Sequence, residues 1–321
     1  MASDFNQGYK MANKKAVVCI VAYNRISPLV NLLTSVLKLH NSVRDYDIVV
    51  SIDKSEKQNE VINAVKSVDN DGIVNIIPRD NRLGLKKHIL SCADIVLSGD
   101  YQYLVMLEDD LEISKFIFPY IESALGSLSK KVGGISLYSY KKEERFGTEF
   151  SPKLDGFDNF YMQYASSWGQ VWTPEMWMGF KSWFVENDCD FFSDDTVPDY
   201  ISRWPKSSWK KHYIRYLIQE NKYFMYPHFS LSSNTGADGE NHKGILNLWK
   251  VNLLSGDKKW NISSFYDSKS VYDVNFLPVG ASTSVKNKSD LYKEFLYQNA
   301  IGPKGYLYLF LLSLRRSFLK G

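Results

Sequence analysis

The first third of the chain alternates between continuous apolar runs and segments with apolar residues at helical spacing. Residues 16–22 (AVVCIVA) form an unbroken, β-branched run, typical of a strand buried on both faces. After Ser27 and Pro28, leucines and valines recur every three or four positions, which predicts a helix. The alternation continues through predicted strands at 47–52, 73–77, 103–107 and 134–137 and predicted helices at 60–68, 84–97 and 116–128. This order predicts an α/β fold with a mostly parallel, doubly wound sheet and helices on both faces.

The pattern becomes less regular after about residue 140. Residues 141–158 are charged and contain glycine, and residues 164–183 hold four tryptophans. A helix is predicted at 209–221, and 226–242 is rich in Ser, Asn and Gly without any periodicity. We therefore expect a second half with more loops than the first.

Composition and charge limit the classes of function. The 321-residue chain carries 39 Lys and Arg against 36 Asp and Glu, and a net charge of +3 argues against a dedicated nucleic-acid binder. Three widely spaced cysteines exclude a disulfide scaffold and a CxxC zinc site. The apolar stretches are shorter than the ~20 residues of a transmembrane helix. Residues 1–15 lack the apolar run of a signal peptide, so we expect a cytoplasmic protein.

Glu108, Asp109 and Asp110 directly follow the predicted strand at 103–107. Ligands of open α/β sheets bind at the carboxyl ends of strands, and Asp53 also follows a predicted strand. Carboxylates this close repel one another unless a cation or a proton offsets their charge. Hard oxygen ligands favour Mg²⁺ or Mn²⁺, which commonly bridge to phosphate oxygens. The triplet therefore predicts either a metal and phosphate site or a solvated acidic turn.

Several segments, in order along the chain, resemble a known family. VVCIVAYNR (17–25), SID (51–53), DNRLGLKKHIL (80–90) and LEDDLEIS (107–114) resemble the nucleotide-sugar half of GT-A glycosyltransferases, and EDDLEIS resembles N-acetylglucosaminyltransferase I and its relatives. Two later segments are similar to bacterial family-2-like transferases that build surface polysaccharides: SSWGQVWTPEMW (166–177) and YPHFSLSSNTGADGENH (226–242).

The resemblance implies a GT-A (Rossmann-like) fold and divides the chain into four parts. Residues 16–140 would bind the nucleotide sugar, and 141–250 would form the acceptor and catalytic half. Residues 1–15 would be an N-terminal extension, and 251–321 a C-terminal extension ending in an amphipathic, basic tail. The implied enzyme is a hexosyltransferase that uses a UDP-sugar donor and Mn²⁺ or Mg²⁺. Its saccharide acceptor, carried on a polyprenyl diphosphate, would belong to polysaccharide, O-antigen or capsule assembly.

The resemblance also implies which residues contact the nucleotide. Asp53 would accept a hydrogen bond from the uracil N3–H, although an Asp at a strand end equally suits a helix N-cap. Arg82 and Lys86 would face the diphosphate, or belong to a solvated helix face. The full set of nucleotide-binding candidates is Ala22, Tyr23, Arg25, Asp53, Arg82, Lys86, Glu108 and Asp109.

The resemblance assigns the metal to Asp110, with Glu108 and Asp109 on the ribose and the sugar. The resemblance also implies a late histidine that binds the metal or the diphosphate, and His242 is the first choice, since its glycine-rich surroundings let the backbone approach a ligand closely. His228 is the second choice for that role, and a structural histidine is the alternative for both.

Trp168 and Gly169 are predicted to wall the sugar site, since indole faces stack on sugar rings. Trp172 and Trp183 are predicted to belong to the core. An inverting transferase needs a carboxylate to take the proton of the acceptor hydroxyl. The resemblance to N-acetylglucosaminyltransferase I implies that this base lies in the stretch SWKKHY (208–213). That stretch has Lys210 and Lys211 in place of acidic residues, which leaves the base and the stereochemistry open. The candidates for the base are Asp195, Asp199 and Asp238.

Two other functions stay open on the sequence. A non-catalytic carbohydrate-binding protein is compatible with the missing base and with 15% aromatic residues. A sugar-nucleotide pyrophosphorylase is the other, although the glycine-rich run expected after its first strand is replaced by AYNRISP. The tail at 305–320 would either lie on the inner face of the cytoplasmic membrane or pack on its own domain or on a second subunit of a homodimer.

Overall fold

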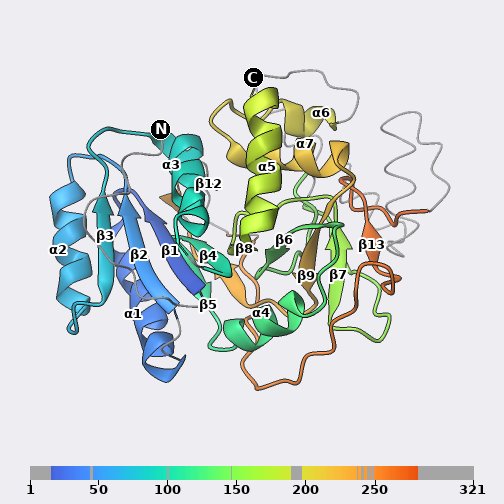
Figure 1. Cartoon of the computed structure of the whole chain (residues 1–321), viewed down its shortest axis with the longest axis horizontal. Coiled ribbons are helices and arrows are strands. Elements are labelled where there is room, and N and C mark those ends of the chain that lie inside the picture. The colour runs from blue at the N-terminus through green and yellow to red at the C-terminus, as the bar shows by residue number, and fades with distance from the viewer. Residues whose placement is uncertain are drawn as a thin grey trace.

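The computed structural model describes most of the chain between residues 16 and 280. The described ranges are 16–43, 46–99, 101–145, 147–188, 197–236, 238–239, 242–243, 247 and 249–280. The predicted N-terminal extension, the tail at 305–320 and the candidate base Asp195 lie outside them. Figure 1 shows one large sheet that crosses the molecule, with helices on either side.

The first half of the sheet is the parallel array that the apolar runs predict. β1 (Ala16–Ala22) pairs with β2 (Tyr46–Ile52) on one side and with β4 (Tyr103–Glu108) on the other, and β3 (Val74–Pro78) extends the array beyond β2. Every side chain of β1 is buried, which explains why this strand is apolar at each position rather than at alternate ones.

The second half of the chain completes the same sheet. Its strands are β6 (Val132–Ser136), β7 (Asn159–Met162), β8 (Gln170–Trp172), β9 (Tyr223–Pro227) and β13 (Val271–Tyr272). The strand order is β13-β7-β9-β6-β8-β4-β1-β2-β3, and β8 runs antiparallel between β4 and β6. The predicted halves therefore share one sheet. Strands of two to five residues that are mostly buried on both faces leave little periodicity to read, so β7, β8, β9 and β13 were not predicted.

Helices cover both faces, as predicted. In Figure 1, α1 and α4 lie on one side of the sheet and α3 and α5 on the other. The helices are α1 (Ile26–Val43), α2 (Gln58–Val68), α3 (Gly84–Ala93) continued by the 3₁₀ turn η1 (Asp94–Leu97), α4 (Ile117–Leu125), α5 (Pro174–Asn187), α6 (Asp199–Ser202) and α7 (Trp209–Gln219). The α/β prediction, with a mostly parallel sheet and helices on both faces, is confirmed.

The interior is dominated by aromatic packing between β8, α5 and α7. Trp172 of β8 is fully buried and stacks on Tyr213 of α7 at 5.6 Å between ring centroids, so its predicted core role is confirmed. Trp183 of α5 is partly buried and packs against the same core. Across the described ranges, no helix combines the length and the apolar character needed to cross a bilayer.

One short antiparallel pair brings the Ser-, Asn- and Gly-rich segment to the end of β4, and a second pair forms at the end of the segment itself. β10 (Ser232–Asn234) pairs with β5 (Leu111–Ile113), with Asn234 opposite Leu111. β11 (Asp238–Gly239) pairs with β12 (His242–Lys243). Part of the segment 226–242 is therefore strand, in contrast to the aperiodic loop that its composition predicts.

Candidate active site

The acidic cluster, defined here as Glu108, Asp109 and Asp110, lies where β4 ends at the carboxyl edge of the sheet. The backbone of Asp109 continues the pairing of β4 with β1, because its N–H donates to the carbonyl of Val21 in β1 at 3.1 Å. The chain then turns into β5. Asp109 and Asp110 are 2% and 7% exposed and Glu108 is half-buried, so the cluster is not the solvated acidic turn that was its alternative.

Arg25, at the start of α1, joins the cluster as its cation. Its Nη1 donates to Asp110 Oδ2 at 2.9 Å, and its Nη2 donates to Asp109 Oδ1. Asn234 of β10 also reaches Asp110, since its Nδ2 lies 3.3 Å from Oδ2. The structure thus brings the predicted residues Arg25, Asp109 and Asp110 together and adds Asn234, which the sequence marks only as part of a Ser- and Asn-rich segment.

Each carboxyl group of the acidic cluster keeps one buried oxygen without a hydrogen-bond partner in the described structure: Glu108 Oε1, Asp109 Oδ2 and Asp110 Oδ1. Burial, reinforced by the charges of its two neighbours, raises the pKa of Glu108 to about 8. Burial also raises the pKa of Asp109 to about 6, and the nearby Arg25 opposes this shift. The cluster therefore has more buried acceptors than the donors of the described residues satisfy.

The unpaired carboxyl oxygens could supply some of the ligands of a cation, but not a complete set. The described side chains contain no group of three or more His, Cys, Asp or Glu that could hold a metal ion by themselves. Asp110 Oδ1 is a buried hard oxygen without a partner, and Mg²⁺ or Mn²⁺ commonly takes one or two carboxylates and completes its shell with phosphate and water oxygens. The backbone of His242 pairs with Gly239, but its side chain lies outside the described structure, so its metal role stays a prediction.

Gly236 lies directly against the acidic cluster. A Cβ added at this position would stand 2.7 Å from Asp110 Oδ2, closer than side chains approach one another. The glycine therefore allows the loop after β10 to pass beside the carboxylate.

Asp53 binds the start of α3 from outside that helix, and it is not itself an N-cap residue, because Lys57 and Leu83 hold the N-cap positions of α2 and α3. Its Oδ1 accepts from the backbone N–H groups of Lys54 and Leu83, and its Oδ2 accepts from that of Gly84 at 2.9 Å. These bonds tie the end of β2 to the start of α3. Oδ2 can accept one further hydrogen bond, so the contact with uracil stays a prediction.

Arg82 and Lys86, the two residues predicted to face the diphosphate, have different neighbours in the structure. The Arg82 guanidinium lies over the Tyr23 ring at 5.0 Å from its centroid, beside the loop after β1. The Lys86 ammonium instead pairs with Asp188 at 3.0 Å, at the end of α5. Ala22 is buried at the end of β1.

Trp168 and Gly169 form a buried wall. Trp168 is 7% exposed and packs edge-on against Tyr138 at 4.6 Å and beside Trp249 at 5.6 Å. Gly169 has a positive φ of 88°, a conformation that favours glycine, and an added Cβ would lie 3.1 Å from Ser232 Oγ. Other aromatic rings thus cover much of the indole face that was expected to stack on sugar.

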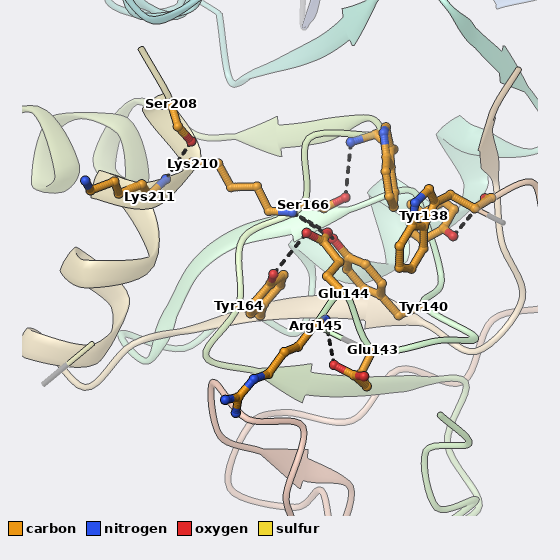
Figure 2. A network of polar contacts seen from close by, with 12 residues as sticks. Tyr138, Tyr140, Glu143, Glu144, Arg145, Tyr164, Ser166, Ser208, Lys210 and Lys211 are labelled. Atoms are coloured by element: carbon orange, nitrogen blue, oxygen red, sulfur yellow. Dashed lines mark hydrogen bonds and ion pairs between the residues drawn. The ribbon is translucent and has the colours of Figure 1, made fainter. Parts of the chain in front are cut away.

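Lys210, in the first turn of α7, lies in what we term the Lys210 cage: Glu144 and the rings of Tyr140, Tyr164, Trp168 and Trp204. Figure 2 shows its side chain reaching toward Glu144. Lys210 Nζ forms an ion pair with Glu144 and a hydrogen bond with Tyr140 Oη at 3.1 Å. It also lies 4.8 Å from the centroid of the Tyr164 ring, and Tyr164 Oη donates to Glu144 at 3.0 Å. The position where the resemblance expects a carboxylate thus holds a buried cation.

Of the remaining base candidates, Asp199 is the one whose side chain the structure describes, and it is not brought to this place. Asp199 opens α6, its side chain is 70% exposed, and its ion-pair partner is Arg203 at 3.7 Å. Asp238 belongs to β11, but its side chain lies outside the described structure, as all of Asp195 does. The sequence analysis also missed Glu144, because it lies in the charged stretch 141–158 with no regular pattern to single it out.

Comparison with known proteins places these features in a family. Two solved structures that resemble the chain are S. aureus TarS 1-349 in complex with UDP-GlcNAc (14% identity, TM-score 0.46, 70% of this chain and 60% of that chain) and the mannosyltransferase PcManGT from Pyrobaculum calidifontis in complex with GDP-Man and Mn²⁺ (11% identity, TM-score 0.38, 62% and 55%). The chain spans about three fifths of the length of the TarS structure. No curated protein sequence matches it. The family model described as "Glycosyl transferase family 2" matches residues 17–182, slightly more than half of the chain and from β1 into α5, and the chain belongs to this family.

Proposed function

We propose that the chain transfers a sugar from a UDP-sugar donor to a saccharide acceptor with the help of Mn²⁺ or Mg²⁺. The observation that carries this proposal is the acidic cluster, in which three buried carboxyl oxygens have no partner within the described structure. Unpaired buried acceptors are costly, so a site that keeps them is suited to a ligand that supplies positive charge or hydrogen-bond donors. Their place at the carboxyl edge of an open sheet is where such folds bind nucleotides.

The roles of the individual residues follow from their contacts. Asp110 would hold the metal through Oδ1, and a bound metal would neutralise the charge that develops on the departing diphosphate. Arg25 fixes the orientation of Asp109 and Asp110, because one guanidinium binds both. Glu108 and Asp109 would accept hydrogen bonds from ribose or sugar hydroxyls through their unpartnered oxygens.

The proposal extends to the acceptor and to the cellular location of the protein. The resemblance of residues 166–177 and 226–242 to bacterial surface-polysaccharide transferases supports a lipid-linked saccharide acceptor. An amphipathic, basic tail at 305–320 would suit peripheral contact with an anionic membrane, and homodimerisation is its alternative.

The substitution Asp110→Asn tests the proposal, because it removes one charge and keeps the shape of the side chain. We expect the affinity for UDP in the presence of Mn²⁺, measured by calorimetry, to fall by roughly a hundredfold while the circular dichroism spectrum stays unchanged. Glu112→Gln is the matched control, since Glu112 lies two residues further along and is exposed. Unchanged affinity in Asp110→Asn would overturn the metal assignment.

A non-catalytic carbohydrate-binding protein is the second candidate, favoured by the cation at Lys210 where a base was expected. Incubating the protein with a panel of UDP-sugars and Mn²⁺ separates the two candidates. Slow release of UDP from one donor supports the transferase, and binding of a UDP-sugar without release supports the binding protein.

A further inference from the structure

Gln170, the first residue of β8, is a buried amide that the structure leaves unpaired. Its side chain is fully buried in the middle of the sheet. Neither Nε2 nor Oε1 has a hydrogen-bond partner among the described residues. Folded proteins pair nearly all of their buried polar groups, so an amide with two unpaired atoms calls for a partner that is absent from the free protein.

The sheet around Gln170 cannot supply that partner. Its neighbours across the two ladders are Met106 of β4 and Ser136 of β6. A thioether is only a weak acceptor. The proton of the Ser136 hydroxyl is already donated to the carbonyl of Tyr138 at 2.9 Å, its oxygen accepts from the Tyr138 N–H at 3.1 Å, and it forms no hydrogen bond with Gln170.

The register places Gln170 beside the acidic cluster. Side chains of directly paired residues in a ladder point to the same face, and side chains two residues apart in a strand also share a face. Gln170 therefore shares the face of Met106 and of Glu108, its diagonal neighbour on β4. Glu108 Oε1 lacks a hydrogen-bond partner as well. Two adjacent polar side chains thus have unpaired atoms on one face of the sheet.

The same face is covered by the N-terminal part of α7. Trp172, two residues beyond Gln170, contacts Trp209 and stacks on Tyr213 of α7. The next α7 residue, Lys210, is close enough to Glu108 for their charges to influence each other, and its ammonium lies 5.7 Å from the centroid of the Trp168 ring. The unpaired amide of Gln170 and the unpaired carboxyl oxygen of Glu108 together offer a donor and acceptors to a hydroxyl-rich ligand, and the neighbouring Lys210 cage supports them.

We propose that Gln170 recognises the sugar of the nucleotide-sugar donor, with Nε2 donating to and Oε1 accepting from a hydroxyl or acetamido group next to Glu108. This inference rests on the proposed function and adds a residue that discriminates between donor sugars. A sugar that offers no polar group there would leave the amide unpaired in the complex too. The site would therefore select for a polar substituent at that position of the ring.

The test is Gln170→Met, which keeps the length of the side chain and removes both polar atoms. We expect the midpoint of urea unfolding, without nucleotide, to stay at or above that of the wild type, because an unpaired buried amide is removed. We expect calorimetric affinity for UDP, with Mn²⁺ present, to change by less than about twofold, and affinity for the preferred UDP-sugar to fall roughly tenfold or more.

Gln58→Met is the matched control. Gln58 is also buried, but its Nε2 donates to the carbonyls of Ile52 and Arg79, so the same substitution there should lower the unfolding midpoint. A Gln170→Met protein destabilised like Gln58→Met would show that buried water pairs the amide in the free protein, and would overturn the inference. Equal losses for UDP and UDP-sugar would also overturn it. If the wild type binds UDP-sugars and Gln170→Met binds them equally well, only this inference fails; a wild type that binds neither UDP nor UDP-sugar overturns the proposed function as well.

Discussion

The acidic cluster and the Lys210 cage are two neighbouring groups of buried charged residues that differ in how completely they are hydrogen-bonded. In the cage, Glu144 accepts from Lys210, Tyr140 and Tyr164, and aromatic rings surround the ammonium. In the acidic cluster, each of the three carboxyl groups keeps an oxygen without a partner in the described structure. A buried network that is fully paired makes the surrounding structure rigid, whereas unpaired atoms are retained where a ligand completes them. The comparison indicates a supporting role for the cage and agrees with the binding role proposed for the cluster.

The largest expected effect is a loss of stability when the ion pair of the Lys210 cage is broken. Lys210→Ala leaves the Glu144 carboxylate buried among aromatic rings without its counter-ion, and breaking a buried ion pair in this way costs about 3–5 kcal/mol. We expect a loss of that order in the free energy of unfolding measured with urea. Lys57→Met, at an exposed lysine before α2, is the control and should change it little.

A double substitution, Lys210→Met with Glu144→Gln, sharpens this test. It removes both charges and keeps most of the volume, so it should recover a large part of the stability lost in Lys210→Ala. A single variant as stable as the wild type would contradict the supporting role of the cage.

The second prediction concerns the pH dependence of the acidic cluster. The pKa of Glu108 is raised to about 8 in the folded protein from an ordinary value of 4.5, so the folded state holds a proton that the unfolded state loses between these values. The stability that this proton contributes is full below about pH 4.5 and is lost as the pH rises toward 8. The free energy of unfolding of Glu108→Gln should therefore be higher than that of the wild type at pH 8, by roughly 1–3 kcal/mol.

Urea unfolding with a metal chelator present, at pH 5 and pH 8, measures this difference. The advantage of Glu108→Gln should shrink at the lower pH, because the wild-type carboxyl group is then mostly protonated in the folded state. A variant that is less stable than the wild type at pH 8 would show that the ionised carboxylate is paired after all.

The smallest effect is expected at Gly236, which tests how closely the loop after β10 must approach the cluster. Gly236→Ala pushes a methyl group against Asp110 Oδ2, and a small displacement of that carboxylate should weaken Mn²⁺-dependent UDP binding by roughly tenfold, with little loss of stability. Gly256→Ala is the control, because an added Cβ there meets nothing within 4 Å. Equal affinities for the two variants would show that the loop has room to move.

The local patterns of the sequence predicted the parallel half of the sheet and the position of the acidic cluster. The run at 16–22 is apolar because β1 is buried on both faces, and Glu108 is the last residue of a strand whose length is plain from its composition. The Lys210 cage could not be predicted in this way, because Glu144 and Lys210 meet only through the packing of α7 on the sheet. Gln170 was missed because β8 has three residues, too few to show a period.

The pairing of β5 with β10 has a consequence for the order of synthesis. Leu111 leaves the ribosome about 120 residues before its partner Asn234, an interval of roughly 6–25 s at typical elongation rates. The neighbouring strands β1, β2 and β4 are complete by then, and we expect them to pair first, which pulsed hydrogen exchange on nascent chains would detect as protection of β1 amides before those of β10. During that interval the acidic cluster of a growing chain lacks Asn234 and the loop at Gly236, so the proposed site is incomplete until nearly three quarters of the chain has been made.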